Sequence, residues 1–179
     1  MNLLLKILIV IAIAVAVILL VALFLKKEYD IEREITIKKP RKVVFDYLKF
    51  LKNQNNYSKW QMMDPNMKQE YKGTDGTVGF VSSWESNVKN VGKGSQSIKK
   101  IVDGEKIEYD IHFIKPFEGK AIAYMTTDSL SEMETKVKWG FGSRMNYPMN
   151  LMLLFMNMDK MVGNDLTTGL TNLKGVLEK

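Results

Sequence analysis

The C-terminal stretch Asn146–Lys179, NYPMNLMLLFMNMDKMVGNDLTTGLTNLKGVLEK, places its apolar residues at the spacing of an α-helix. At 100° per residue, one arc of that helix collects Leu151, Phe155, Met158, Val162, Leu166, Gly169, Leu170, Leu173, Val176 and Leu177. Such an arc packs against a core. We therefore predict one long C-terminal helix that covers the rest of the domain.

The first half of this predicted helix is apolar on a second side as well. Met145, Met149, Met152 and Met156 widen the arc there, and no charged residue occurs between Arg144 and Asp159. Methionine fills irregular, adaptable apolar space. We expect ligand contact, or an opening toward a membrane, along 145–158.

An unbroken apolar run, Ile7–Leu25, lies near the N-terminus between Lys6 and the pair Lys26 and Lys27. As a helix it is about 28 Å long, close to the ~30 Å hydrocarbon core of a bilayer. We interpret residues 1–27 as a single transmembrane anchor and 28–179 as one domain. The alternative is a cleaved signal peptide, for which Ala12, Ala14 and Ala16 have a suitable spacing.

Basic residues are concentrated on the C-terminal side of this run, which favours a cytoplasmic domain of a membrane protein. They are Lys26, Lys27, Arg33, Lys38, Lys39, Arg41 and Lys42. Without the anchor, 23 of the 26 basic side chains remain against 20 acidic ones, a balance unlike that of a nucleic-acid-binding protein. The chain has no cysteine and hence no disulfide or thiol chemistry. Nothing in the sequence indicates an oligomeric state.

Strict alternation predicts a half-buried strand at Tyr29–Ile37, and helical spacing after Pro40 predicts a helix that ends before Asn53–Asn56. A short helical turn at Tyr57–Trp60 follows. Six further strands are predicted, with Asp75 and Gly76 as a two-residue hairpin turn and another turn at 128–131. These strands are near 68–72, 78–86, 95–102, 106–114, 120–127 and 132–141.

The order of elements predicts an α+β fold in which one face of an antiparallel sheet is covered by the C-terminal helix. Alternation gives the inward-facing residues on three strands. They are Phe80, Ser82 and Trp84; Ile107, Tyr109, Ile111 and Phe113; and Met133, Thr135, Val137, Trp139 and Phe141.

The chain resembles the SRPBCC (START-like) superfamily, and within it the bacterial, membrane-anchored members of the polyketide cyclase/dehydrase and lipid transport family. The resemblance covers about 29–179 and rests on IEREITIKKP (31–40), YSKWQMMDP (57–65), GTVGFVSSWE (76–85) and PMNLMLLFMNMDK (148–160). It implies a helix-grip fold, in which a curved antiparallel sheet wraps round the C-terminal helix and encloses an apolar cavity. It brings no shared catalytic motif.

The implied cavity gives a set of candidate ligand-binding residues, although the same side chains also suit a core without a ligand. They are Phe80, Trp84, Tyr109, Ile111, Phe113, Val137, Trp139, Phe141, Met152 and Phe155, with Ser82, Thr135, Arg33 and Asp159 as polar candidates. Arg33 suits a structural ion pair or an anionic headgroup. Asp159 could line the mouth of the cavity or form an ion pair with a lysine.

No catalytic residue, metal site or cofactor is predicted. The single histidine, His112, has the outward phase of Glu108 and Asp110, so neither a catalytic triad nor a metal-ligand set is recognisable. A phosphate loop needs a following helix and a Lys followed by Ser or Thr, and both are missing after Gly73, Gly76 and Gly79. We interpret these glycines as turn residues.

The preferred hypothesis is a non-enzymatic, membrane-tethered module that holds a lipid or other hydrophobic molecule. One alternative is a cyclase or dehydratase that uses Tyr109 or Asp159 for proton transfer. Another is a regulatory or protein-interaction domain with a vestigial cavity, for which we expect dense packing of the inner wall and no pocket there above roughly 300 Å³.

Overall fold

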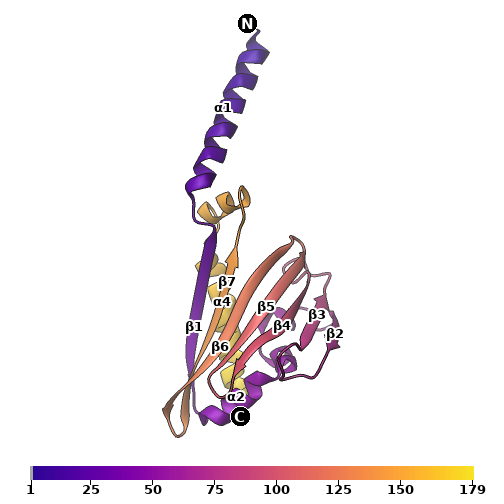
Figure 1. Cartoon of the computed structure of the whole chain (residues 1–179), viewed down its shortest axis with the longest axis vertical. Coiled ribbons are helices and arrows are strands. Elements are labelled where there is room, and N and C mark those ends of the chain that lie inside the picture. Colours follow the sequence, from indigo (N-terminus) through magenta and orange to yellow (C-terminus); the bar gives the residue numbers. More distant parts are fainter. Residues whose placement is uncertain (1) are drawn as a thin grey trace.

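The computed structural model describes residues 2–179 and contains one seven-stranded antiparallel sheet (Figure 1). The strands are β1 (Glu28–Ile37), β2 (Lys68–Lys72), β3 (Val81–Glu85), β4 (Lys93–Val102), β5 (Lys106–Lys115), β6 (Gly119–Ser131) and β7 (Glu134–Arg144). Their spatial order is β1-β7-β6-β5-β4-β3-β2. The first strand therefore pairs with the last, and the predicted α+β fold class is confirmed.

The chain crosses from one sheet edge to the other between β1 and β2, through α2 (Arg41–Lys49), the 3₁₀ helix η1 (Leu51–Asn56) and α3 (Lys59–Met62). Val44, Phe45 and Leu48 of α2 are buried, as its helical spacing predicts. On the inward face of the sheet, Ile107, Tyr109, Val137 and Trp139 are buried in one core with Leu166, Leu170 and Leu173 of the C-terminal helix. The alternation along β5, and along β7 from Thr135 onward, is thus correct. Met133, also predicted to face inward, lies in the β6–β7 turn and is 59% exposed, so that part of the prediction is wrong.

The prediction of one continuous helix from 146 to 179 is wrong. The structure has a short 3₁₀ helix, η2 (Met149–Leu154), and a separate helix, α4 (Met158–Leu177). The side-chain oxygen of Asn157 accepts a hydrogen bond from the Lys160 amide at 2.8 Å, which is the bond of a helix N-cap. A new helix therefore begins after Asn157, and only this second helix covers the sheet.

Two turns also differ from the prediction. The β2–β3 connection is eight residues long, 73–80, because the Asp75 carboxylate accepts hydrogen bonds from the amides of Leu51 and Lys52 at 2.8 and 3.1 Å and so caps η1 instead of closing a two-residue hairpin. Gly73, Gly76 and Gly79 all have positive φ in this loop, which confirms them as turn residues. Residues 128–131 continue β6, and the turn lies at Glu132 and Met133.

The N-terminal helix α1 (Leu3–Phe24) projects away from the domain (Figure 1). Its mean hydropathy is 3.6, and it is long and apolar enough to cross a membrane. Ala22 is its buried residue. The other end of the sheet lies near α2 and the C-terminus, so α1 marks one end of the domain.

The end of α1 is fixed to the domain by three hydrogen bonds. The Asn150 side-chain amide donates to the carbonyl oxygens of Ala22 at 2.7 Å and Leu25 at 3.4 Å. The Met145 amide donates to the Lys27 carbonyl at 2.7 Å and continues the β1–β7 pairing by one step. The last carbonyls of a helix have no amide donor within the helix. Segment 145–150 supplies donors to such carbonyls at the end of α1 and just after it.

Candidate ligand-binding cavity

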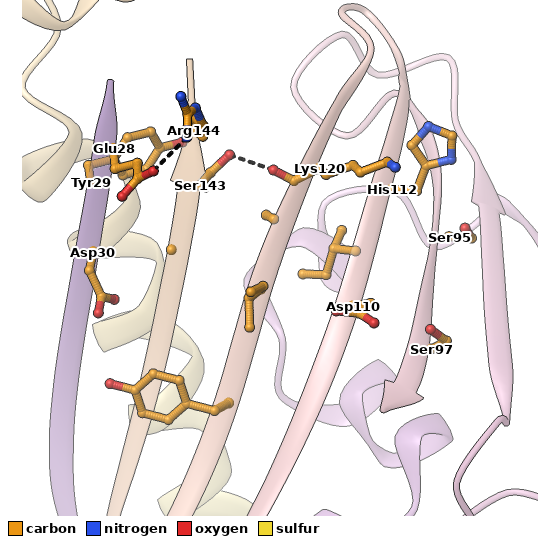
Figure 2. Close-up of a pocket in the computed structure, with 15 residues that line it drawn as sticks. Glu28, Tyr29, Asp30, Ser95, Ser97, Asp110, His112, Lys120, Ser143 and Arg144 are labelled. Carbon is orange, nitrogen blue, oxygen red and sulfur yellow. Dashed lines mark hydrogen bonds and ion pairs between the residues drawn. The ribbon is translucent and has the colours of Figure 1, made fainter. Parts of the chain in front are cut away.

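One hollow is an open trough of about 1060 Å³ on the outer face of the sheet (Figure 2). Two pairs of its polar groups interact with each other: Arg144 with Glu28 at 3.0 Å, and the Ser143 hydroxyl with the Lys120 carbonyl at 2.8 Å. His112 lies in this trough at 43% side-chain exposure, which confirms its outward phase. Small-molecule sites bury most of their ligand, so an open trough is a poor candidate.

The second hollow is a cavity of about 240 Å³ between the inward face of the sheet and the helices. Its lining is predominantly apolar and aromatic, with a few amides and the hydroxyls of Tyr29 and Ser58. The lining residues are Tyr29, Gln54, Ser58, Trp60, Gln61, Met67, Trp84, Asn90, Val91, Gln96, Ile111, Phe113, Ala123, Trp139, Phe141 and Val162. This inner cavity has the composition of a hydrophobic-ligand site, and its volume is just below the usual ~300–1,000 Å³.

Strand register places the inner cavity at the end of the sheet from which α1 departs. Tyr29 is the second residue of β1 and pairs with Ser143 near the end of β7. Phe113 lies near the end of β5 and pairs with Gly119, the first residue of β6. Val162 lies near the start of α4. The cavity therefore occupies the α1-proximal half of the domain.

Aromatic rings in edge-on and tilted contact form the cavity wall. Trp84 meets Phe113 with ring centroids 6.2 Å apart, and Phe113 meets Phe141 at 6.4 Å. Trp60 of α3 stands edge-on to Trp139 of β7 at 6.0 Å. Such contacts hold large apolar rings in defined positions. The wall is therefore a fixed apolar surface.

Two contacts position this wall. Lys59 of α3 forms an ion pair with Asp165 of α4, which fixes the helix that carries Trp60. The Trp84 indole N–H donates to the Val91 carbonyl at 3.1 Å. The indole N–H of Trp84 is thereby satisfied inside the protein, and its ring lines the cavity.

Gln54 is the polar group in the lining that has an unmet hydrogen bond. Its side chain is 4% exposed, and its Nε2 atom is buried without a hydrogen-bond partner. The Tyr57 hydroxyl lies near this amide but outside hydrogen-bond geometry, and it donates its own hydrogen bond to the Met125 sulfur at 3.5 Å. A buried donor without an acceptor is costly. A ligand oxygen in the cavity would relieve that cost.

Sequence reasoning missed Gln54 because Asn53–Asn56 was interpreted as a break between elements. The sequence did contain a signal, because residues of the same burial recur at every third position. Leu51, Gln54 and Tyr57 are all buried, as residues on one side of a 3₁₀ helix must be. A polar residue midway between two buried apolar residues at that spacing indicates a buried amide.

Of the predicted ligand-binding residues, five line the inner cavity: Trp84, Ile111, Phe113, Trp139 and Phe141. Phe80, Tyr109 and Val137 are buried in the core outside the lining. Met152 and Phe155 also lie outside it, and Phe155 is 87% exposed. The expected place of these last two in the cavity wall is therefore wrong, because they precede α4, the helix that faces the sheet.

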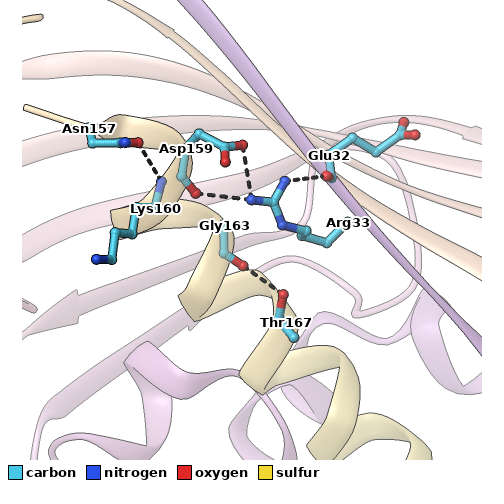
Figure 3. A network of polar contacts seen from close by, with 7 residues as sticks. All are labelled: Glu32, Arg33, Asn157, Asp159, Lys160, Gly163 and Thr167. Atoms are coloured by element: carbon cyan, nitrogen blue, oxygen red, sulfur yellow. Dashed lines mark hydrogen bonds and ion pairs between the residues drawn. The ribbon is translucent and has the colours of Figure 1, made fainter.

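Three of the four polar candidates have structural partners. Ser82 is buried, and the Thr135 hydroxyl donates to the Lys39 carbonyl at 2.8 Å. Arg33 forms the structural ion pair of our prediction, with the Asp159 carboxylate at 2.9 Å and the Asp159 carbonyl at 3.1 Å (Figure 3). The expected lysine partner of Asp159 is thus wrong. None of these residues lines the inner cavity.

Tyr109 is poorly placed for proton transfer. Burial raises the pKa of its phenol, and the hydroxyl has no hydrogen-bond partner. Asp159 has a side chain that is 70% exposed and is held by Arg33. Neither of the two candidate residues of the cyclase or dehydratase alternative therefore lines the inner cavity.

Neither a protein-family model nor a curated protein matches this sequence. Solved structures do match. The Zhui aromatase/cyclase from Streptomyces sp. R1128 superposes with a TM-score of 0.60 at 13% identity, over 84% of this chain and 94% of that one. This likeness shows a helix-grip fold, as the resemblance of the sequence implied.

Two more helix-grip structures illustrate the range of similar proteins. The di-domain aromatase/cyclase StfQ of the steffimycin biosynthetic pathway matches with a TM-score of 0.62 at 9% identity, over 85% of this chain and 51% of that one. Ara h 8.0201 matches with a TM-score of 0.56 at 14% identity, over 84% of this chain and 97% of that one. At these identities the likeness shows the fold alone.

Proposed function

We propose that this protein is a membrane-anchored helix-grip module that holds part of a lipid or other hydrophobic molecule in the inner cavity. The observation that carries the proposal is the position of the cavity at the end of the sheet from which α1 departs. An anchor at that end keeps the cavity close to the bilayer. The local concentration of a membrane-derived ligand is then high, because the binding step is effectively intramolecular.

The cavity volume limits what enters. A volume of about 240 Å³ is too small for a whole phospholipid and suits a single slender apolar chain or a small ring system. The unpartnered Nε2 donor of Gln54 calls for an oxygen acceptor on the part that enters. The ligand class is therefore an apolar chain or ring with a carbonyl, carboxyl or hydroxyl oxygen.

Membrane anchoring by α1 is part of the proposal. The hydrogen bonds from Asn150 to the carbonyls of Ala22 and Leu25 support a helix that remains with the domain rather than a cleaved signal peptide. The excess of Lys and Arg after α1 favours the cytoplasmic side for the domain. The protein is then a single-pass membrane protein.

The small cavity also favours a second candidate, a regulatory or protein-interaction domain with a vestigial cavity. The two candidates differ in one measurement. A vestigial cavity binds no hydrophobic probe, whereas a functional one takes up an oxygen-bearing apolar molecule and excludes water from the Gln54 amide. No observation favours the cyclase alternative.

The test uses the full chain in lipid nanodiscs and a fluorescent fatty acid as probe. We expect saturable binding that Ala123→Leu weakens at least tenfold, because this side chain fills the cavity from β6. Ala121→Leu is the matched control, since Ala121 has the same inward phase on β6 but lies outside the cavity lining. Absence of saturable binding, or equal loss in both folded variants, would refute a ligand-binding role of the cavity.

A further inference from the structure

Segment 147–156 exposes an unusual amount of apolar surface. Met149 is 47% exposed, Leu154 57% and Phe155 87%. The sequence from 145 to 158 has no charged residue. Single exposed apolar side chains are ordinary on soluble proteins, but a contiguous, uncharged group of them marks an interaction surface.

The depth of this segment in a bilayer follows from its hydrogen bonds to α1. The 22 residues of α1 span about 33 Å, slightly more than the ~30 Å hydrocarbon core. Asn150 of η2 donates to the carbonyl of Ala22, which lies in the last turn of α1. With α1 across the bilayer, η2 therefore lies at the boundary of hydrocarbon and headgroups, not in bulk water.

We propose that Tyr147–Met156, which we call the interfacial segment, lies in this boundary and docks the cavity end of the domain onto the lipid surface. The inference rests on the proposed anchoring by α1. Lipid is the partner that covers the exposed apolar side chains of this segment. The Asn150 hydrogen bonds hold the segment against the end of α1, so its surface continues the lipid-facing surface of that helix. A short amphipathic element of this kind buries its apolar side among the upper acyl chains.

The flanking residues fit the same depth. Lys26 and Lys27 follow α1 directly and place their ammonium groups among the headgroups. Tyr147, which is 41% exposed, is of the residue type enriched at membrane–water interfaces. Two contacts, α1 and the interfacial segment, then set the orientation of the domain, which a single helix with a free hinge would leave undefined.

The experiment uses the absence of cysteine, which allows single labels on the full chain. Phe155→Cys is spin-labelled and reconstituted in nanodiscs, and its accessibility to oxygen and to a water-soluble nickel chelate is measured. Val78→Cys is the matched control, because Val78 is 61% exposed in the β2–β3 loop at the far end of the sheet. Val15→Cys, in the middle of α1, reports whether α1 is inserted.

We expect the label at 155 to be accessible to oxygen and protected from nickel like that at 15, with the reverse at 78. Protection at 15 together with nickel accessibility at 155 would overturn the interfacial segment and leave the anchor standing. Protection of 155 from both reagents would indicate a protein contact and also overturn the inference. Nickel accessibility at 15 would refute the anchor, independently of the probe-binding measurement on the cavity.

Discussion

Gly169 of α4 lies against the indole of Trp139 on β7, so closely that a Cβ at position 169 would be 2.6 Å from Cζ3 of Trp139. The helix therefore approaches the sheet at a point where only glycine fits. Trp139 is 4% exposed and forms part of the cavity wall. The spacing between α4 and the sheet at this point thus determines where the wall stands.

Gly169→Ala should displace Trp139 toward the cavity and lower the free energy of unfolding by about 1–2 kcal/mol. Overpacking of a core costs about 1–3 kcal/mol, and the better helix propensity of alanine returns up to about 1 kcal/mol. Gly175→Ala is the control on the same helix, where a Cβ meets nothing within 4 Å. Chemical denaturation of both variants checks the difference; equal stabilisation would show that Trp139 yields freely.

Gln54→Leu should stabilise the ligand-free protein by about 1 kcal/mol, because it removes a buried donor without a partner. The same change should weaken binding of the fluorescent fatty acid about tenfold, or ~1.4 kcal/mol. Both quantities are measured on one preparation, by denaturation and by titration.

Gln61→Leu is the control for this amide. Gln61 also lines the cavity, but its Oε1 already accepts a hydrogen bond from Gln69 at 2.8 Å. Its replacement should therefore destabilise the protein instead of stabilising it. A Gln54→Leu variant with unchanged fatty-acid affinity would show that Nε2 does not meet the ligand.

Tyr124→Phe should raise the pKa of Glu32 toward its usual 4.5. The Tyr124 hydroxyl donates to Glu32 at 2.6 Å and is the main reason why this pKa is lowered, with Lys138 at 3.1 Å as a further cause. NMR titration of the Glu32 carboxyl measures the change. Glu85, whose pKa is lowered by Lys93, should titrate identically in both proteins.

The sign of the stability change follows from linkage. A carboxyl whose pKa is lowered by folding contributes stability above its unfolded pKa and loses it as the pH falls through the folded value. The protein should therefore lose stability below pH 4.5, and Tyr124→Phe should lose less over that range. An identical acid profile would remove Glu32 as a contributor.

Asn150→Leu should loosen the junction between α1 and the domain. It removes the amide that donates to the carbonyls of Ala22 and Leu25 in a fully buried position. Loss of such bonds costs about 1–2 kcal/mol, so amide hydrogen exchange at Met145 should become roughly tenfold faster or more. Asn146→Leu, at an exposed position nearby, should leave the exchange rate unchanged.

The strands were predictable because the pleat imposes a period of two that survives in the sequence. Tyr109, Val137 and Trp139 face inward as their alternation requires. The cavity wall followed from the same phase, together with the fold resemblance. The phase alone could not separate residues at the cavity end, such as Phe113, from core residues such as Tyr109, since both point inward.

The C-terminal helix was mispredicted because a helical projection assumes one continuous helix and does not reveal where a helix stops and another begins. In that projection Phe155 falls on the same side as Leu166 and Leu170. In the structure, a new helix begins after Asn157, so Phe155 does not belong to the helix that carries the two leucines. A polar residue with capping ability inside an apolar run was the available sign. Gln54 was missed for a related reason, since η1 follows a period of three rather than 3.6.

The junction of α1 and β1 limits how far the domain can reach. Only Leu25, Lys26 and Lys27 separate the two elements, a span of about 10 Å at full extension, and a hydrogen bond to Met145 already fixes the last of them. With α1 in a bilayer, the domain would stay close to the surface of its own leaflet and could not reach a neighbouring membrane. On the proposed function, a ligand taken up from that leaflet would therefore have to be released at the same membrane surface.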